Sequence, residues 1–268
     1  MSMIYDIRST ERAQQTLSIL TGVSLSIWER YLGHECDYTY TEDLVADVIE
    51  RYGHCPISYR DFDFIYFHIT TSANECCSIQ RHGLLDLKQA YSRQDSELRI
   101  FLENHGIHIN LNEQILVYGD QTFDIAYHSG VRPMRNGIEQ CCWAIGRKFY
   151  YDFTSCGFLS VWERSPYGGQ VHCRPEIIGD IERLLNLPLS RKWTQTHNPF
   201  EVVAKVNGDK IVYGGDDEQD ERDKVLNYLT KAYLTAFAEP SEEILLLKNN
   251  VQIPPEDIIE IRPLSHWR

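Results

Sequence analysis

The chain has 268 residues, 43% of them hydrophobic, so it can bury a substantial core and is not expected to be disordered. No run approaches the roughly 18 consecutive apolar residues of a membrane-spanning helix, and the first residues lack the basic patch and apolar stretch of a secretion signal. With 26 Lys and Arg against 39 Asp and Glu, the formal net charge is -13. That argues against a broad non-specific coat on nucleic acid, but leaves room for an enzyme that grips a few nucleotides in a small basic cleft.

The N-terminal part of the chain is predicted to be helical. Ser9 or Thr10 is placed to cap a helix that continues through Trp28, and a second helix fits 41–52 with Gly53 as its stop. We therefore predict two parts, a helical N-terminal extension over 1–58 and a single domain over 59–268. The extension is expected either to pack as a layer on the sheet or to serve as a docking surface for a partner.

The segment 61–71 is predicted to be an interior strand. It reads DFDFIYFHITT, and alternation places apolar side chains on both of its faces. A turn and a short helix follow, with Gly83 as the helix stop.

The rest of the chain is predicted to mix short strands and helices. Helices are expected at 87–104, 175–185 and 222–238. Strands are expected at 114–118, 123–128, 141–152, 157–163, 200–206, 243–247 and 257–263. Because these elements do not follow a regular strand–helix alternation, the fold class is α+β rather than a doubly wound sheet.

Common catalytic signatures are absent from the sequence. It contains no phosphate-cradling P-loop, no dinucleotide-binding glycine motif, no H-E-x-x-H and no G-x-S-x-G. His105 and His108 have loosely metal-like spacing, but no third ligand accompanies them. We therefore predict no metal site.

Two segments carry a pattern when they are taken together. The first is YFHITTSAN at 66–74 with SIQRHGLL at 78–85, and the second is PSEEILLL at 240–247 with IPPEDI at 253–258. This combination resembles ADP-ribosyltransferase domains, in which a strand ending in His/Arg-x-Thr precedes a short helix and a Gly-Leu stop. In such domains an acidic residue opens a later strand, and a Pro-Pro-acidic turn leads into the last one. The chain is most similar to DarT-type toxins that modify nucleic acid. It departs from their I-T-h-x-x-N-L-x-S-I-L run at Glu75, in place of Leu, and at 77–79.

The resemblance implies an ADP-ribosyltransferase-like split β-sheet with flanking helices, NAD as the cosubstrate, and a catalytic carboxylate. Cleavage of the bond to nicotinamide passes through an oxocarbenium-like transition state, as in glycoside hydrolysis. A carboxylate near the nicotinamide ribose stabilises the growing positive charge. Glu243 suits that role because it opens a strand, and Glu242 is the alternative. Without the resemblance, Glu242 and Glu243 are equally typical of solvent-exposed residues at the start of a strand.

The resemblance also implies a set of NAD-binding residues. His68 is expected to hydrogen-bond a ribose hydroxyl, the backbone at Ile69 to hold the nicotinamide amide, and Thr70 to shape the same turn. Asn74 either contacts NAD or caps the next helix. The family's middle motif lies on a strand opposite the first, and we assign it to Tyr151, with Tyr150, Ser160 and Tyr167 as alternatives. An assisting arginine is expected among Arg93, Arg132, Arg135, Arg147 and Arg174.

The function expected from this resemblance is mono-ADP-ribosyl transfer from NAD to a macromolecule in the cytoplasm, with no membrane partner. The resemblance favours RNA or DNA as acceptor, and 191–193 (Arg-Lys-Trp) offers basic and aromatic groups that suit a single strand. By family analogy the protein acts as a toxin or phage-defence effector held by an antitoxin. Two alternatives stay open, a protein acceptor and a catalytically degenerate module that binds a nucleotide or partner.

Overall fold

The computed structural model describes residues 3–33, 37–126, 132–133, 137–162, 165, 170–214, 219–238 and 240–264. Helices are mixed with largely antiparallel strands, so the fold class is α+β, as predicted. The chain divides into two compact units. The first unit comprises Met1–His68, Cys156–Ser165 and Val203–Leu247, and the second comprises Ile69–Ser155, Pro166–Val202 and Lys248–Arg268.

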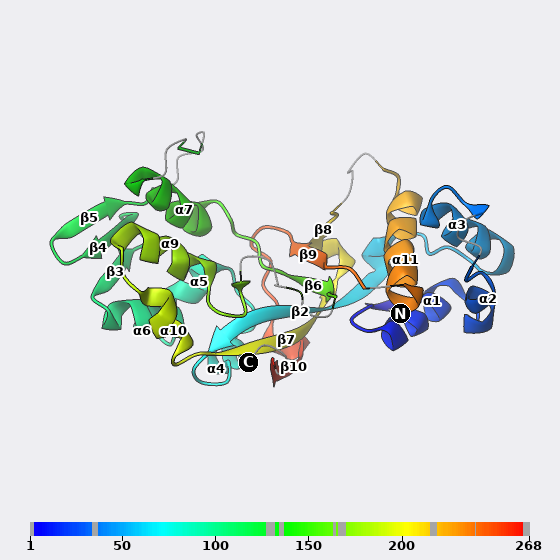
Figure 1. Ribbon diagram of the computed structural model, residues 1–268, viewed down its shortest axis with the longest axis horizontal. Helices are drawn as coiled ribbons and strands as arrows, with labels where there is room; N and C mark the ends of the chain where they lie inside the picture. The colour runs from blue at the N-terminus through cyan, green and yellow to red at the C-terminus, as the bar shows by residue number, and fades with distance from the viewer. Residues whose placement is uncertain are drawn as a thin grey trace. The chain divides into compact units, whose positions relative to one another are not determined.

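The main sheet has the strand order β10-β7-β2-β6-β9-β8, and β1 pairs with β2 off this path (Figure 1). Its strands are β1 (Met3–Asp6), β2 (Phe62–Ser72), β6 (Cys156–Ser160), β7 (Asn198–Asn207), β8 (Ile211–Val212), β9 (Glu243–Leu247) and β10 (Ile258–Pro263). The strands predicted at 61–71, 157–163, 200–206, 243–247 and 257–263 are thereby confirmed. β2 is buried on both faces along most of its length, which explains its continuous run of apolar residues.

The N-terminal segment is not wholly helical. Residues Met3–Asp6, which precede the helices predicted within the 1–58 extension, form β1, and this strand pairs in parallel with β2. The single helix predicted to continue through Trp28 is in fact two, α1 (Thr10–Thr21) and α2 (Leu25–Arg30). They separate at Gly22, which takes a left-handed conformation with φ 72° and donates its N–H to the Ser18 carbonyl. The helix α3 (Thr41–Tyr52) ends at Gly53 as predicted.

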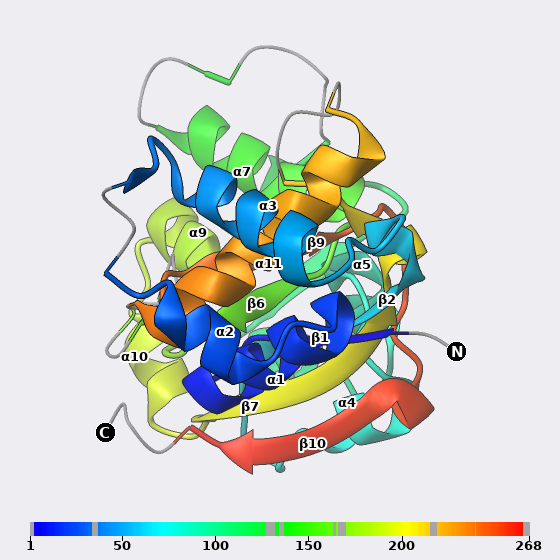
Figure 2. The same ribbon diagram turned by 90° about the vertical axis from the view of Figure 1, so that its right-hand side faces the viewer.

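In the first unit, α1 and α3 both pack on the long helix α11 (Glu221–Phe237), as Figures 1 and 2 show. Aromatic side chains join this helix to the sheet. Tyr5 on β1 and Phe64 on β2 lie 5.0 Å apart between ring centroids, and Phe64 lies 5.0 Å from Tyr228 on α11. The Tyr5 hydroxyl donates to the Tyr228 carbonyl at 2.8 Å. The N-terminal segment is thus a packed layer of this unit.

The second unit is built on helices and a small antiparallel sheet, which share one core. The helices are α4 (Cys77–His82), α5 (Leu87–Ser92), α6 (Glu97–Asn104), α7 (Ile138–Tyr150), α9 (Glu176–Leu185) and α10 (Leu189–Thr194). The small sheet has the order β3-β4-β5, formed by Ile107–Asn110, Ile115–Tyr118 and Gln121–Asp124. Trp193, Tyr91, Phe149 and Phe101 are buried aromatic side chains of this core.

Two predictions in this unit are wrong. The segment 141–152 was expected to be a strand but forms most of α7, because its buried residues Cys142, Ile145 and Phe149 recur at helical rather than alternating spacing. The single helix expected over 87–104 is two helices. Ser96 is the N-cap of the second helix, α6, because its hydroxyl oxygen accepts a hydrogen bond from the Arg99 N–H.

The later parts of the two sequence segments that carry the family resemblance contact each other in the second unit. Leu84 and Ile253 exchange backbone hydrogen bonds of 2.9 and 3.1 Å. Gly83, which ends α4 with φ 78°, lies so close that a Cβ there would stand 1.9 Å from the Ile253 carbonyl oxygen. Only glycine fits both this conformation and this approach. The Pro-Pro turn after Ile253 forms the short 3-10 helix Pro255–Asp257 before β10.

Candidate functional site

The strand β2 holds His68 next to the neighbouring strand β6. The Nδ1 atom of His68 lies 2.7 Å from the carbonyl oxygen of Cys156. Because a carbonyl only accepts, Nδ1 carries the hydrogen, and the neutral ring keeps Nε2 as an acceptor. Burial lowers the pKa of His68, opposed by the hydrogen bond to Cys156, so the neutral form is favoured at neutral pH. This histidine is therefore prepared to accept a hydrogen bond from a hydroxyl group.

Strand β6 lies between the strand of His68 and the strand of Glu243. Phe67 on β2 is in register with Phe158 on β6, and Phe158 is in register with Ile244 on β9. These three side chains share one face of the sheet, so their neighbours His68 and Leu245 point to the other face. Alternation along β9 places Glu243 on the face of Leu245. His68 and Glu243 therefore lie on the same face, separated by one strand.

A glycine in β6 makes this arrangement possible. Gly157 is in register with Leu245 of β9, and its strand β6 lies between β2 and β9. A Cβ at Gly157 would stand 2.4 Å from Cδ2 of Tyr66 and 2.6 Å from the carbonyl oxygen of Phe67. The ring of Tyr66 thus occupies the space that a side chain at this position would need, and the pairing of β2 with β6 depends on the glycine.

The carboxylate of Glu243 is held by two polar neighbours. The Ser241 hydroxyl donates to Oε1 at 2.6 Å, and the Lys231 Nζ of α11 lies 2.9 Å from Oε2. The side chain of Glu243 keeps 20% of its surface exposed. Burial raises the pKa of Tyr228, and the charge of Glu243 adds to that shift. The carboxylate of Glu243 is therefore held in place at the start of β9, beside an aromatic layer.

Ser160 and Glu242 complete this part of the first unit. Ser160 is in register with Glu243 after an irregularity in β6, is buried, and donates its hydroxyl hydrogen to the Ser241 carbonyl at 2.9 Å. Glu242 accepts a short hydrogen bond from the Ser165 hydroxyl. The two adjacent glutamates thus have different partners, which allows their roles to be separated by mutation.

The loop after β2 is tied down by hydrogen bonds in the second unit. Ser72 donates its hydroxyl hydrogen to Oε1 of Glu97 at 2.6 Å, and the Ala73 N–H donates to Oε2 at 2.6 Å. The Ser72 oxygen also accepts from the N–H groups of Asn74 and Cys76 at 3.1 and 2.8 Å. Glu97 therefore acts as a clamp on this loop. The sequence did not point to it, since Glu97 stands 25 residues beyond Ser72.

Asn74 has a structural role in that loop. Its Oδ1 accepts from the Cys77 N–H at 3.1 Å, at the start of α4. Of the two roles expected for Asn74, capping of the next helix is therefore observed. The two residues that follow, Glu75 and Cys76, both have positive φ, at 59° and 60°. Two consecutive left-handed non-glycine residues cost energy, so the surrounding hydrogen bonds must hold this turn in place. Ile69 is buried and Thr70 half-buried in β2, just before the loop.

Trp193 is not available for stacking on a nucleobase. Its side chain is only 1% exposed, its Nε1–H donates to the Thr71 hydroxyl at 2.9 Å, and its ring lies 3.5 Å from that of His197 in a stacked geometry. The interpretation of 191–193 as an aromatic and basic grip is therefore wrong for Trp193. The indole instead anchors α10 to the end of β2. Arg191 and Lys192 are both exposed.

Tyr151 lies at the C-terminal end of α7 and is 56% exposed. Of the strands that pair with β2, β6 is the one that also pairs with β9, and it carries Ser160 and neither Tyr150 nor Tyr151. Tyr150 donates its hydroxyl hydrogen to the Leu111 carbonyl at 3.0 Å. The Tyr167 alternative lies outside the described residues.

The expected arginines are scattered. Arg93 is exposed after α5, and Arg132 and Arg147 both lie over the ring of Trp143, with guanidinium carbons 5.9 and 5.7 Å from its centroid. Arg174 precedes α9. Arg135 falls outside the described residues.

The comparisons with known proteins add no family to this picture. No family model, no curated protein and no solved structure matches the chain. Within the described part of the chain, no cluster of three or more His, Cys, Asp or Glu side chains is arranged to hold a metal ion. Searched over those same residues, the helices include none with the length and apolar character to cross a bilayer.

Proposed function

We propose that this protein transfers ADP-ribose from NAD to a macromolecular acceptor, on an ADP-ribosyltransferase-like sheet. The observation that carries the proposal is the adjacency of β2, β6 and β9. Sequence resemblance selected His68 and Glu243 from segments 175 positions apart, and strand pairing brings both to one face with a single strand between them. The resemblance implies such a neighbourhood, with the middle motif on a strand opposite the first.

The proposed reaction uses the two groups in complementary roles. The bond between the ribose C1 and the nicotinamide nitrogen breaks, and its electron pair leaves with nicotinamide. Glu243 stabilises the positive charge that develops on the ribose, and neutral His68 accepts a hydrogen bond from a ribose hydroxyl. The acceptor forms the new bond to C1 and releases a proton to solvent. On this model Ser160, in register with Glu243, occupies the middle-motif position, in place of Tyr151.

Nucleic acid is the acceptor that we propose, on the resemblance to DarT-type toxins, together with a toxin or phage-defence role under the control of an antitoxin. Half-buried Trp143, with the guanidinium groups of Arg132 and Arg147 over its ring, supplies aromatic and basic groups that buried Trp193 does not. A protein acceptor is the alternative that the same experiment tests.

The test is label transfer from NAD that carries radiolabel in its ADP-ribose part, with RNA, DNA and cell protein offered separately. Wild-type protein is expected to label one acceptor and release nicotinamide. Glu243→Gln keeps the shape but removes the charge, and is expected to lower transfer by about 100-fold or more. Glu242→Gln is the matched control, since Glu242 is adjacent in sequence but bonded to Ser165, and it should retain most of the activity.

One observation favours a second function, a nucleotide-binding module without turnover. The ion pair between Lys231 and Glu243 partly neutralises the charge that catalysis would use. If NAD binds with a measurable heat but neither wild type nor Lys231→Met releases nicotinamide, the binding module is correct and the transferase is not. Nicotinamide release by either protein, lost on Glu243→Gln, rejects the binding module.

A further inference from the structure

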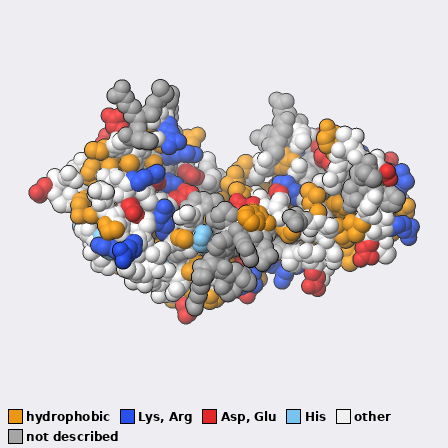
Figure 3. Space-filling model, viewed as in Figure 1, with side chains coloured by type: hydrophobic (Ala, Val, Ile, Leu, Met, Phe, Trp, Pro, Cys, Tyr) orange, Lys and Arg blue, Asp and Glu red, His pale blue; other side chains and the backbone are white. Residues whose placement is uncertain are grey.

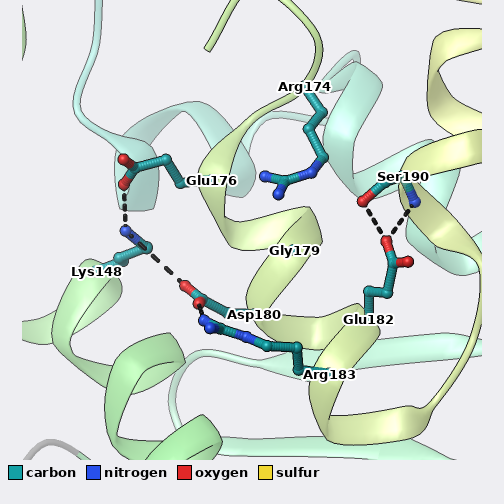
Figure 4. A pocket seen from close by; sticks show the side chains of 8 residues that line it. All are labelled: Lys148, Arg174, Glu176, Gly179, Asp180, Glu182, Arg183 and Ser190. Atoms are coloured by element: carbon teal, nitrogen blue, oxygen red, sulfur yellow. Dashed lines mark hydrogen bonds and ion pairs between the residues drawn. The ribbon is translucent and has the colours of Figure 1, made fainter. Parts of the chain in front are cut away.

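A polar pocket lies within the second unit, among α7, α9 and α10 (Figure 4). Its volume of about 440 Å³ is in the range of small-molecule sites. The residues that line it are largely charged: Lys148, Arg174, Glu176, Gly179, Asp180, Glu182, Arg183 and Ser190. On the face drawn in Figure 3, Lys and Arg side chains gather over these helices, with carboxylates among them. Neither His68 nor Glu243 is among these residues, although Arg174 is one of the arginines that the resemblance offered as an assisting group.

Two of the acids in the pocket are neutralised by two of its cations. The Nζ of Lys148 lies 2.5 Å from Oε2 of Glu176 and 3.9 Å from Oδ2 of Asp180. Arg183, one turn along α9, forms a short ion pair with the other oxygen of Asp180, which is buried. Neither Lys148 nor Arg183 therefore has its charge free for an incoming group.

The third acid is also engaged. One carboxylate oxygen of Glu182 accepts from the backbone N–H of Ser190 at 2.7 Å and from its hydroxyl group. As Figure 4 shows, these bonds hold the start of α10 against α9. Glu182 thus serves the structure of the pocket wall.

Arg174 is different from the other two cations. Among the described residues its guanidinium group has no carboxylate within ion-pair distance, and the one hydrogen bond of that group is a long one of 3.5 Å, from Nη1 to the Pro175 carbonyl. Its half-buried guanidinium lies in the pocket, without a bond to the other lining residues (Figure 4). A planar cation held in a hollow without an acid partner is suited to an anion that accepts two hydrogen bonds in one plane.

Gly179 is shaped to the guanidinium of Arg174. It lies inside α9, where glycine is less favourable than alanine. A Cβ at this position would stand 2.6 Å from Nη2 and 2.7 Å from the central carbon of Arg174. The glycine therefore leaves the space in which the guanidinium lies flat on the helix. α9 begins at Glu176, so its first N–H groups add partial positive charge nearby.

We propose that this pocket binds a phosphate group through Arg174, with Gly179 as the floor on which the guanidinium rests. The phosphate belongs to a nucleotide, to a nucleic-acid backbone or to a free phosphate ester. This site goes beyond the proposed transferase activity, and its test needs no NAD turnover, so either proposal can fail without the other.

The experiment is titration calorimetry of the whole chain with inorganic phosphate at low salt. Wild type is expected to bind one phosphate saturably. Arg174→Gln and Gly179→Ala are each expected to weaken binding by about tenfold or more, the second because its methyl group displaces the guanidinium. Since only a flexible side-chain end must move, Gly179→Ala should fold normally, which circular dichroism checks. Arg191→Ala, an exposed arginine on α10 outside the lining, is the control and should bind like wild type.

Competition then identifies the source of the phosphate. Displacement of phosphate by NAD assigns the pocket to a dinucleotide, displacement by a single-stranded oligonucleotide assigns it to a nucleic-acid backbone, and displacement by neither assigns it to a small phosphate ester. The proposal is overturned if wild type shows no saturable binding. It is also overturned if Gly179→Ala binds like wild type, or if Arg191→Ala weakens binding as much as Arg174→Gln.

Discussion

The clamp that Glu97 forms on the loop after β2 allows a quantitative prediction. Its carboxylate accepts two hydrogen bonds of 2.6 Å, from the Ser72 hydroxyl and the Ala73 N–H, and its side chain is only 16% exposed. A hydrogen bond to a charged group contributes about 1.5–3 kcal/mol. Replacement by alanine removes both, and water can reach part of the site. We therefore expect Glu97→Ala to lower the free energy of unfolding by about 2–4 kcal/mol.

Urea unfolding followed by circular dichroism measures this loss, and two further variants sharpen it. Glu97→Gln keeps one acceptor oxygen for the Ala73 N–H, so its cost should be roughly half that of alanine. Glu103→Ala is the matched control on the same helix. Glu103 pairs with Arg99 at the surface, a contact worth about 0.3–0.5 kcal/mol. Equal small losses for Glu97→Ala and Glu103→Ala would refute the clamp, because the carboxylate would then contribute no more than a surface charge.

Two other predictions concern the sheet. Gly157→Ala should lower the free energy of unfolding by about 2–3 kcal/mol in urea, because the new methyl group meets the Phe67 carbonyl, which cannot move without disturbing β2. The control is Gly137→Ala, which has open space around it and should change that free energy by about 0.5 kcal/mol at most. Equal effects of the two substitutions would contradict the close approach of Gly157 to Phe67. Burial lowers the pKa of His68 below 6.5, so the unfolded chain takes up a proton more readily than the folded chain. Stability is then full above pH 6.5 and falls as the pH drops from there toward the folded-state pKa. Urea midpoints measured across this pH range should fall less steeply for His68→Gln than for wild type. Some fall remains in the variant, because burial also lowers the pKa of His197. An equally steep fall in the variant would show that His68 does not contribute to the pH dependence.

Local pattern was sufficient where one signal dominated. β2 was predictable because a run that is apolar on both faces is typical of an interior strand, and α3 because acidic residues at its start and Gly53 at its end mark both termini. The α7 segment was mispredicted because its aromatic and cysteine residues favour strands, while the spacing of Cys142, Ile145 and Phe149 was helical. In that segment the period of the buried residues was the better guide.

The parts of the site that depend on long-range pairing were beyond the sequence. The register that sets Ser160 against Glu243 joins residues 83 positions apart, and no local spacing encodes it. Trp193 looked like part of a surface loop because its neighbours Arg191 and Lys192 are charged, but the bond to Thr71 buries its indole. Glu97 was missed because its hydrogen-bond partners, Ser72 and Ala73, lie 25 and 24 residues earlier in the chain.

The geometry around His68 and Glu243 also limits what could replace them. The tautomer of His68 is set by a backbone carbonyl of β6, and the direction of Glu243 by the alternation of β9, so both depend on strand pairing rather than on neighbouring side chains. A change that keeps the strands but removes the charge of Glu243 therefore leaves the binding surface in place. For this reason Glu243→Gln separates catalysis from binding. If the variant still binds NAD but transfers nothing, the charge acts in the chemistry, and if it also loses NAD, the carboxylate is part of the binding site.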